Sequence, residues 1–123
     1  MVYRDKHWTC PRDAGWLVHV RVGRHELMRC GHCRGAFVHP VVLHEMYDAM
    51  GGLWPRCEPI EALRPLRCPA PTCCDPLQRA QVPLRPGYAH IDSCAWHGVW
   101  FDRGVLEQVL ERAGLDALEV LRP

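Results

Sequence analysis

The sequence predicts a small α+β protein stabilised by metal, in which one pattern of a β-hairpin followed by a helix occurs twice. Three observations lead to this fold class. Most of the eight cysteines lie in close pairs, a strand-like stretch separates the two pairs of each half, and each half ends in a helical pattern. Because a module of about 60 residues rarely buries enough apolar surface to fold alone, each half needs a staple.

The choice of staple is between disulfides and metal. Residues 1–12 are polar and charged and lack the apolar segment of a signal peptide, and no apolar run approaches the length of a membrane span. We therefore expect a cytoplasmic protein that does not enter a membrane. Its thiols should stay reduced, and clustered reduced cysteines are typical metal ligands.

The first hairpin follows from alternation. In residues 17–22 the valines alternate with His19 and Arg21, which predicts a strand with one apolar and one polar face. Residues 23–24 supply the turn, and residues 25–29 form the expected return strand.

A short helix should close the first half at residues 40–50. Four side chains form its apolar stripe, and two glycines then end it. The stripe consists of Leu43, Met46, Tyr47 and Met50.

The second hairpin is less regular because Pro83 and Pro86 interrupt it. Its strands are expected at residues 78–82 and 87–91, with Pro83 confined to an edge or to the turn.

The second helix has the clearest pattern of the chain. Asp102 suits its N-cap, and Gly114 suits its end. Its apolar stripe consists of Leu106, Val109, Leu110 and Ala113. A final short helix is expected at residues 115–121.

These elements divide the chain into residues 1–52, a proline-rich linker at residues 53–66, and residues 67–123. Within the second half, Trp96 and Trp100 flank the last ligand pair. They are expected to pack the helix onto the hairpin.

The second half offers a conventional zinc site. Zinc binds four soft or borderline donors in a tetrahedron, usually two from each of two tight turns. Cys94 and His97 have the standard spacing, whereas four residues separate Cys68 from Cys73. Cys74 is the alternative ligand, although Cys73 keeps the four-residue step to the next leucine that the first half also shows. We expect these four residues to bind Zn²⁺.

The first half offers a less conventional site. Its candidate ligands are Cys10, Asp13, Cys30 and Cys33. Asp13 stands where a fourth cysteine would be expected, and a carboxylate oxygen can bind zinc. His32 or His7 is the alternative fourth ligand. A second Zn²⁺ is therefore expected here.

The two ligand patterns carry a family resemblance. The stretch from Cys10 to Asp13, the hairpin, and the stretch from Cys30 to Val38 resemble the transcription factor IIB-like zinc ribbon family of bacterial proteins. Residues 98–106, Gly-Val-Trp-Phe-Asp-Arg-Gly-Val-Leu, are very close to its helix-entry motif. The resemblance implies two tandem zinc ribbons, and it does not imply a particular function.

Charge constrains the partner. The net charge is +1, although residues 1–34 hold seven basic and three acidic side chains. A nearly neutral chain attracts nucleic acid weakly, so a protein partner is favoured and a nucleic-acid-binding ribbon is the alternative. Nothing in the sequence indicates the oligomeric state.

An enzyme is the least favoured interpretation. Three thiolates make zinc a poor Lewis acid, and a thiol-redox motif such as Cys30-x-x-Cys33 would normally open a helix in a βαβ unit. We therefore expect a non-catalytic interaction module.

Overall fold

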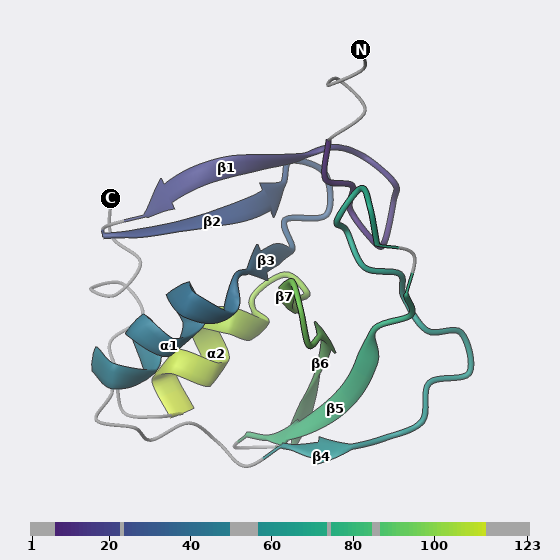
Figure 1. Ribbon diagram of the computed structural model, residues 1–123. Coiled ribbons are helices and arrows are strands. Elements are labelled where there is room, and N and C mark those ends of the chain that lie inside the picture. Colours follow the sequence, from purple (N-terminus) through teal and green to yellow (C-terminus); the bar gives the residue numbers. More distant parts are fainter. Residues whose placement is uncertain (1–6, 23, 50–56, 74, 85–86, 113–123) are drawn as a thin grey trace.

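The computed structural model describes residues 7–22, 24–49, 57–73, 75–84 and 87–112 (Figure 1). It confirms the small α+β class, with one antiparallel sheet and two helices. In chain order the elements are β1 Leu17–Val22, β2 His25–Cys30, β3 Ala36–Val38, α1 Pro40–Ala49, β4 Glu58–Pro59, β5 Gln78–Pro83, β6 Tyr88–Cys94, β7 Gly98–Phe101 and α2 Val105–Arg112.

Both expected hairpins form. β1 pairs with β2 from Leu17 opposite Cys30 to Val22 opposite His25, and this register leaves a two-residue turn. β5 pairs with β6, and Pro83 lies at the end of its strand, next to the turn. β2 and β6 each end on a candidate ligand, so the hairpins place the second ligand pair of each half.

Two short strands, β3 and β7, are absent from the sequence-based expectation. They pair with each other, with Phe37 opposite Trp100, and give the continuous sheet order β1-β2-β3-β7-β6-β5-β4. The register is symmetric, because Ala36 lies opposite Phe101 while Val38 lies opposite Val99. The two halves therefore meet as similar units in one sheet.

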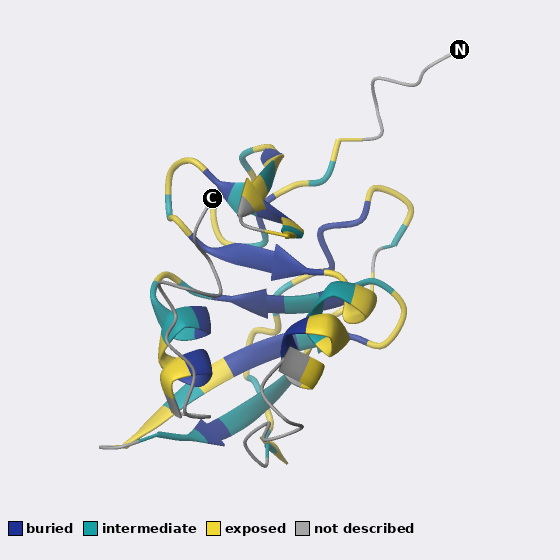
Figure 2. Ribbon diagram, turned by 90° about the vertical axis from the view of Figure 1, so that its left-hand side faces the viewer, coloured by how far each residue is buried: buried dark blue, intermediate teal, exposed yellow. Residues whose placement is uncertain are grey.

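The sheet separates two apolar clusters. It curves around α1 and α2, which lie side by side on one face (Figure 1). The helix-side cluster combines helix and strand residues, all buried: Leu27, Ala36, Val38, Met46, Val82, Ile91, Phe101, Leu106, Val109 and Leu110. On the opposite face Phe37 and Trp100 pack with four cysteines. Figure 2 shows buried residues gathered on the central strands.

The helical stripes are confirmed where the structure describes them. Met46 of α1 and Leu106, Val109 and Leu110 of α2 are buried in the helix-side cluster, and Leu43 packs against it. The side chains of Tyr47, Met50 and Ala113 lie outside the described residues, as do Gly114 and the helix expected at residues 115–121.

The N-cap expected at Asp102 is wrong. Its carboxylate accepts hydrogen bonds from Trp100 Nε1 at 3.0 Å and from Arg12 Nε and Nη2 at 2.9 and 2.8 Å. The Val105 amide donates instead to the Asp102 backbone carbonyl at 2.9 Å. A partner 90 positions away in the sequence has replaced a local interaction.

The expected role of the two tryptophans is also wrong. Trp96 is 79 % exposed, and Trp100, although fully buried, packs on the sheet face opposite the helices.

Within the segment expected to be a linker, Glu58 and Pro59 form β4 and pair with Gln81 and Ala80 of β5.

Substitution of Gly35 tests the junction between the halves. A Cβ atom at Gly35 would overlap the Trp100 ring, whereas one at Gly31 would meet open space. We predict that Gly35→Ala lowers the free energy of unfolding by about 1–3 kcal/mol because it overpacks this contact. Gly31→Ala, in the same turn, should change it by less than about 0.5 kcal/mol. Urea denaturation with zinc present measures the free energy of unfolding of both variants. Equal losses would contradict the close contact between Gly35 and the Trp100 ring.

Candidate metal centres

Tight turns present the candidate ligands of the first half. The Arg12 amide donates to Cys10 Sγ at 3.3 Å, and the His32 amide donates to Cys30 Sγ at 3.4 Å. Backbone amides directed at sulfur stabilise a thiolate. Ala14 and Arg34, the residues directly after Asp13 and Cys33, have φ of 63° and 65°. This left-handed conformation costs about 1–2 kcal/mol per non-glycine residue, and both turns adopt it directly after their second ligand.

The second half repeats this amide pattern. The amide of Ala70 donates to Cys68, and the amide of Trp96 donates to Cys94. Each of the four turns therefore directs the amide of residue i+2 at the sulfur of its first cysteine.

The first cluster brings together Cys10, Asp13, Cys30 and Cys33. One ligand atom from each lies within 4.8 Å of the others, so the group could hold a metal ion. Cys10 Sγ lies 3.5 Å from Cys33 Sγ, and Cys30 Sγ lies 3.4 Å from Asp13 Oδ2. The Gly15 amide donates to Asp13 Oδ1 at 2.8 Å, which orients the exposed carboxylate and lowers its pKa.

Neither alternative fourth ligand joins this cluster. The His7 ring stacks on Trp16, with centroids 3.8 Å apart and planes at 7°. His32 contributes its backbone amide to Cys30, and its ring is outside the group of four donors. Among the described residues Asp13 is thus the candidate for the fourth donor.

The second cluster brings together Cys68, Cys73, Cys94 and His97, again within 4.8 Å. His97 Nδ1 lies 3.5 Å from Cys68 Sγ and 3.4 Å from Cys94 Sγ. A tetrahedral zinc ion with ordinary bond lengths places sulfur and nitrogen ligands about 3.5 Å apart, so these donors fit the ion. Cys74, the alternative to Cys73, lies outside the described residues.

The thiols of the second cluster differ in acidity. Burial raises the pKa of Cys68 to about 12. Burial would also raise the pKa of Cys94, but hydrogen bonds from the Trp96 amide and the His97 ring outweigh it and lower the pKa to about 7. In the first cluster burial raises the pKa of Cys10. A bound cation would favour the thiolate at all these positions, so metal binding should release protons.

The two clusters lie on the same face of the sheet and contact each other through the N-terminal segment. The Thr9 amide donates to the Pro69 carbonyl at 3.1 Å. The Trp8 ring lies 5.8 Å from His97 and 5.9 Å from Phe37, measured between ring centroids. Trp8 was not among the site residues expected from the sequence, although it occupies the same place before Cys10 that an apolar leucine occupies before Cys68.

Arg12 is a second residue near the site that was not expected from the sequence. Its bidentate ion pair with Asp102 joins the turn that carries Cys10 and Asp13 to the entry of α2. The pair raises the pKa of Arg12. It also lowers the pKa of Asp102, although burial of this carboxylate acts in the opposite direction. No local signal identifies such a contact, because only the folded sheet brings the two residues together.

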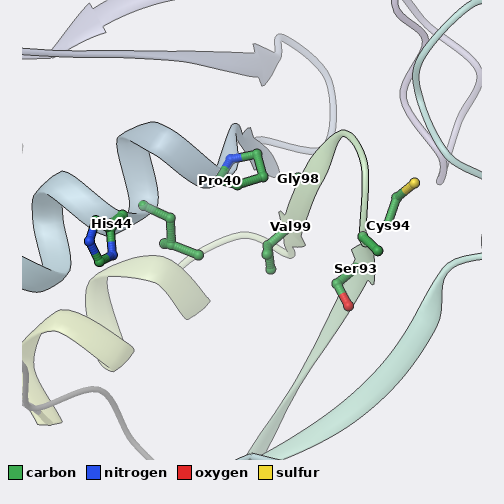
Figure 3. A pocket seen from close by; sticks show the side chains of 8 residues that line it. Pro40, His44, Ser93, Cys94, Gly98 and Val99 are labelled. Carbon is green, nitrogen blue, oxygen red and sulfur yellow. The ribbon is translucent and has the colours of Figure 1, made fainter.

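A groove of about 370 Å³ lies between α1 and the β6–β7 turn. Figure 3 shows the Cys94 sulfur directed away from α1, and the Ser93 hydroxyl and His44 ring at opposite ends of the groove.

Comparison with protein-family models, curated proteins and solved structures finds no match for the chain. The candidate metal centres therefore rest on the geometry of their own residues. None of the described helices has the length and apolar character needed to span a membrane.

Substitution of Asp13 tests the first cluster. A carboxylate is a harder ligand than a thiolate and suits zinc less well beside three thiolates. Asp13→Ala should release the first zinc ion to a weaker chelator than the wild type requires, and Asp13→Cys should retain it against a stronger one. Competition with graded chelators measures this order.

Asp75→Ala serves as the control, because Asp75 is exposed in the corresponding turn of the second half but is not part of a cluster. If wild type and both Asp13 variants lose zinc at the same chelator strength, Asp13 is not a ligand.

Proposed function

We propose that the chain is a non-catalytic interaction module made of two tandem zinc ribbons, each stapled by one structural Zn²⁺. The observation that carries this proposal is the presence of two separate sets of four donors, each gathered within 4.8 Å. Three sulfurs with one nitrogen or oxygen form a donor set that suits zinc.

The hydrogen bonds around the first cysteine of each half support the ribbon assignment. The Cys10 amide donates to the Gly15 carbonyl, and the Leu17 amide donates to the Trp8 carbonyl. The second half repeats both bonds around a loop two residues longer, from Cys68 to Asp75 and from Leu77 to Leu66. This repeated geometry agrees with the resemblance to transcription factor IIB-like zinc ribbons.

Structural zinc fits these clusters better than catalytic zinc. A catalytic site keeps one position open for water or substrate, whereas each cluster supplies four protein donors. The three sulfurs of each set would also reduce the Lewis acidity of the metal.

The surface favours a protein partner over nucleic acid. On β1, His19 and Arg21 are exposed and could contact phosphates. The net charge of +1 nevertheless supplies little of the counterion-release energy on which tight nucleic-acid binding depends. A nearly neutral net charge with only a few exposed basic residues therefore supports docking to a protein better than binding to nucleic acid.

Metal analysis tests the proposal. Purified protein should contain about two zinc ions per chain, and chelation should unfold it, because small metal-stapled modules fold together with their metal. Cys94→Ser should remove one zinc ion and destabilise the whole sheet, because the two halves share the helix-side cluster. Cys57→Ser, outside both clusters, should retain both ions. A metal-free preparation that still melts cooperatively would refute the structural role of the metal.

Nucleic-acid binding tests the choice of partner. Binding to DNA or RNA should be weak and should fall steeply with salt, because few basic side chains contribute to it. Fluorescence anisotropy with labelled oligonucleotides at two salt concentrations measures this. Sub-micromolar, sequence-selective binding at physiological salt would favour the nucleic-acid-binding alternative instead.

A further inference from the structure

Among the residues that the structure describes, β1 forms an edge of the sheet with no further strand beside it. It is the terminal strand of the sheet order, and its register with β2 determines which backbone groups point outward. The Leu17 amide donates to the Trp8 carbonyl instead of to β2. Because antiparallel pairs alternate between hydrogen-bonded and non-hydrogen-bonded positions, the N–H and C=O groups of His19 and Arg21 also point away from β2. Within the described residues, no backbone group pairs with them.

The opposite edge of the sheet differs in a way that matters for docking. β4 has only two residues, and one of them is Pro59, which has no N–H to donate. β1 has six residues and no proline. Long open edges are templates for additional strands, and natural proteins usually shield them. β1 is therefore the edge that can accept an extended segment.

The side chains of β1 present two different surfaces beside this edge. Val18 is 54 % exposed, and the neighbouring Trp16 is 64 % exposed on the same side of the strand. On the other side His19 and Arg21 are exposed, and Arg24 in the turn is exposed as well. The one acidic side chain of the hairpin, Glu26, lies opposite Arg21 and 3.3 Å from His19 Nδ1, so it offsets part of the positive charge on this side. Arg21 and Arg24 together still outnumber it, which leaves this side of the edge with a net positive charge.

We propose that β1 is a docking edge that adds an extended segment of a partner protein to the sheet. The segment would have apolar side chains toward Trp16 and Val18 and acidic side chains toward His19 and Arg21. The inference rests on the proposed docking function and names the chemistry of the partner. Backbone hydrogen bonds to the edge would supply affinity, and the alternating side chains would supply specificity.

Charge disfavours a second copy of this chain as the occupant. If two β1 strands paired antiparallel through their open edges, the outward residues would meet as His19 opposite Arg21, His19 opposite His19, or Arg21 opposite Arg21. Only the register with Arg21 opposite Arg21 sets two permanent cations against each other, which destabilises the pair, and none of the three sets an acidic side chain opposite Arg21. An acidic segment meets no such repulsion.

Hydrogen exchange on the zinc-loaded full chain tests the first requirement. The amides of His19 and Arg21 should exchange fast in the free protein and slow down when a capped hexapeptide of alternating valine and glutamate is added. A peptide with lysine in place of glutamate should bind about tenfold more weakly. The glutamate peptide with N-methylated backbone amides on its pairing side should give no protection.

Two variants locate the binding at β1. His19→Pro removes an outward-facing donor, and a proline is tolerated where its position faces away from the neighbouring strand. It should abolish peptide protection while the zinc content stays unchanged. Arg21→Glu should reverse the preference between the glutamate and lysine peptides. Arg103→Glu, an exposed arginine at the entry of α2, is the matched charge control and should change neither.

The outcomes separate this inference from the proposed function. Slow exchange of both amides in the free protein, or peptide binding that survives His19→Pro, would overturn the docking edge. So would a dimer that His19→Pro abolishes, or protection of these amides by an oligonucleotide but not by the peptide. Because every sample is first shown to hold two zinc ions, such a failure leaves the structural metal sites intact. Loss of the zinc result would instead refute the proposed function itself.

Discussion

Phe37 and Trp100 lie opposite each other where β3 pairs with β7, and this contact makes one sheet out of two similar halves. Each half contributes too few apolar residues for an independent core. By joining edge to edge, the halves share one helix-side cluster and place both candidate metal centres on the other face. Gly35 lies directly against the Trp100 ring, so any side chain at that position would push the halves apart.

Metal binding would stabilise the cysteine thiolates, which burial against the sheet disfavours. Four cysteines of the two clusters are buried beside Phe37 and Trp100, where burial alone disfavours thiolates. The amides of the tight turns offset part of this cost, and a cation among the four donors would offset the rest. The first centre differs from the second because Asp13 is exposed and hard, whereas His97 is partly buried and contacts Trp8. The second centre is thus better suited than the first to hold a metal ion permanently.

Local signals predicted the hairpins, the helices and the two donor sets, because alternation, helical periodicity and ligand spacing all act over a few residues. β3 and β7 escaped prediction because Ala36–Val38 and Gly98–Phe101 are short apolar runs without alternation. Their pairing is a long-range property of the fold. The same reason explains Asp102, whose local N-cap signal was overridden by Arg12. Trp96 was predicted to pack in the core because it lies beside a ligand pair in the sequence, but the turn directs its side chain to solvent.

We propose that both candidate metal centres are closed, structural zinc sites. X-ray absorption at the zinc edge of the purified protein tests this most directly, because it reports the ligands of the metal itself. On average each zinc ion should have three sulfurs at about 2.3 Å and one nitrogen or oxygen at about 2.0–2.2 Å. A shell dominated by nitrogen and oxygen, or one with fewer than three sulfurs per zinc, would contradict it.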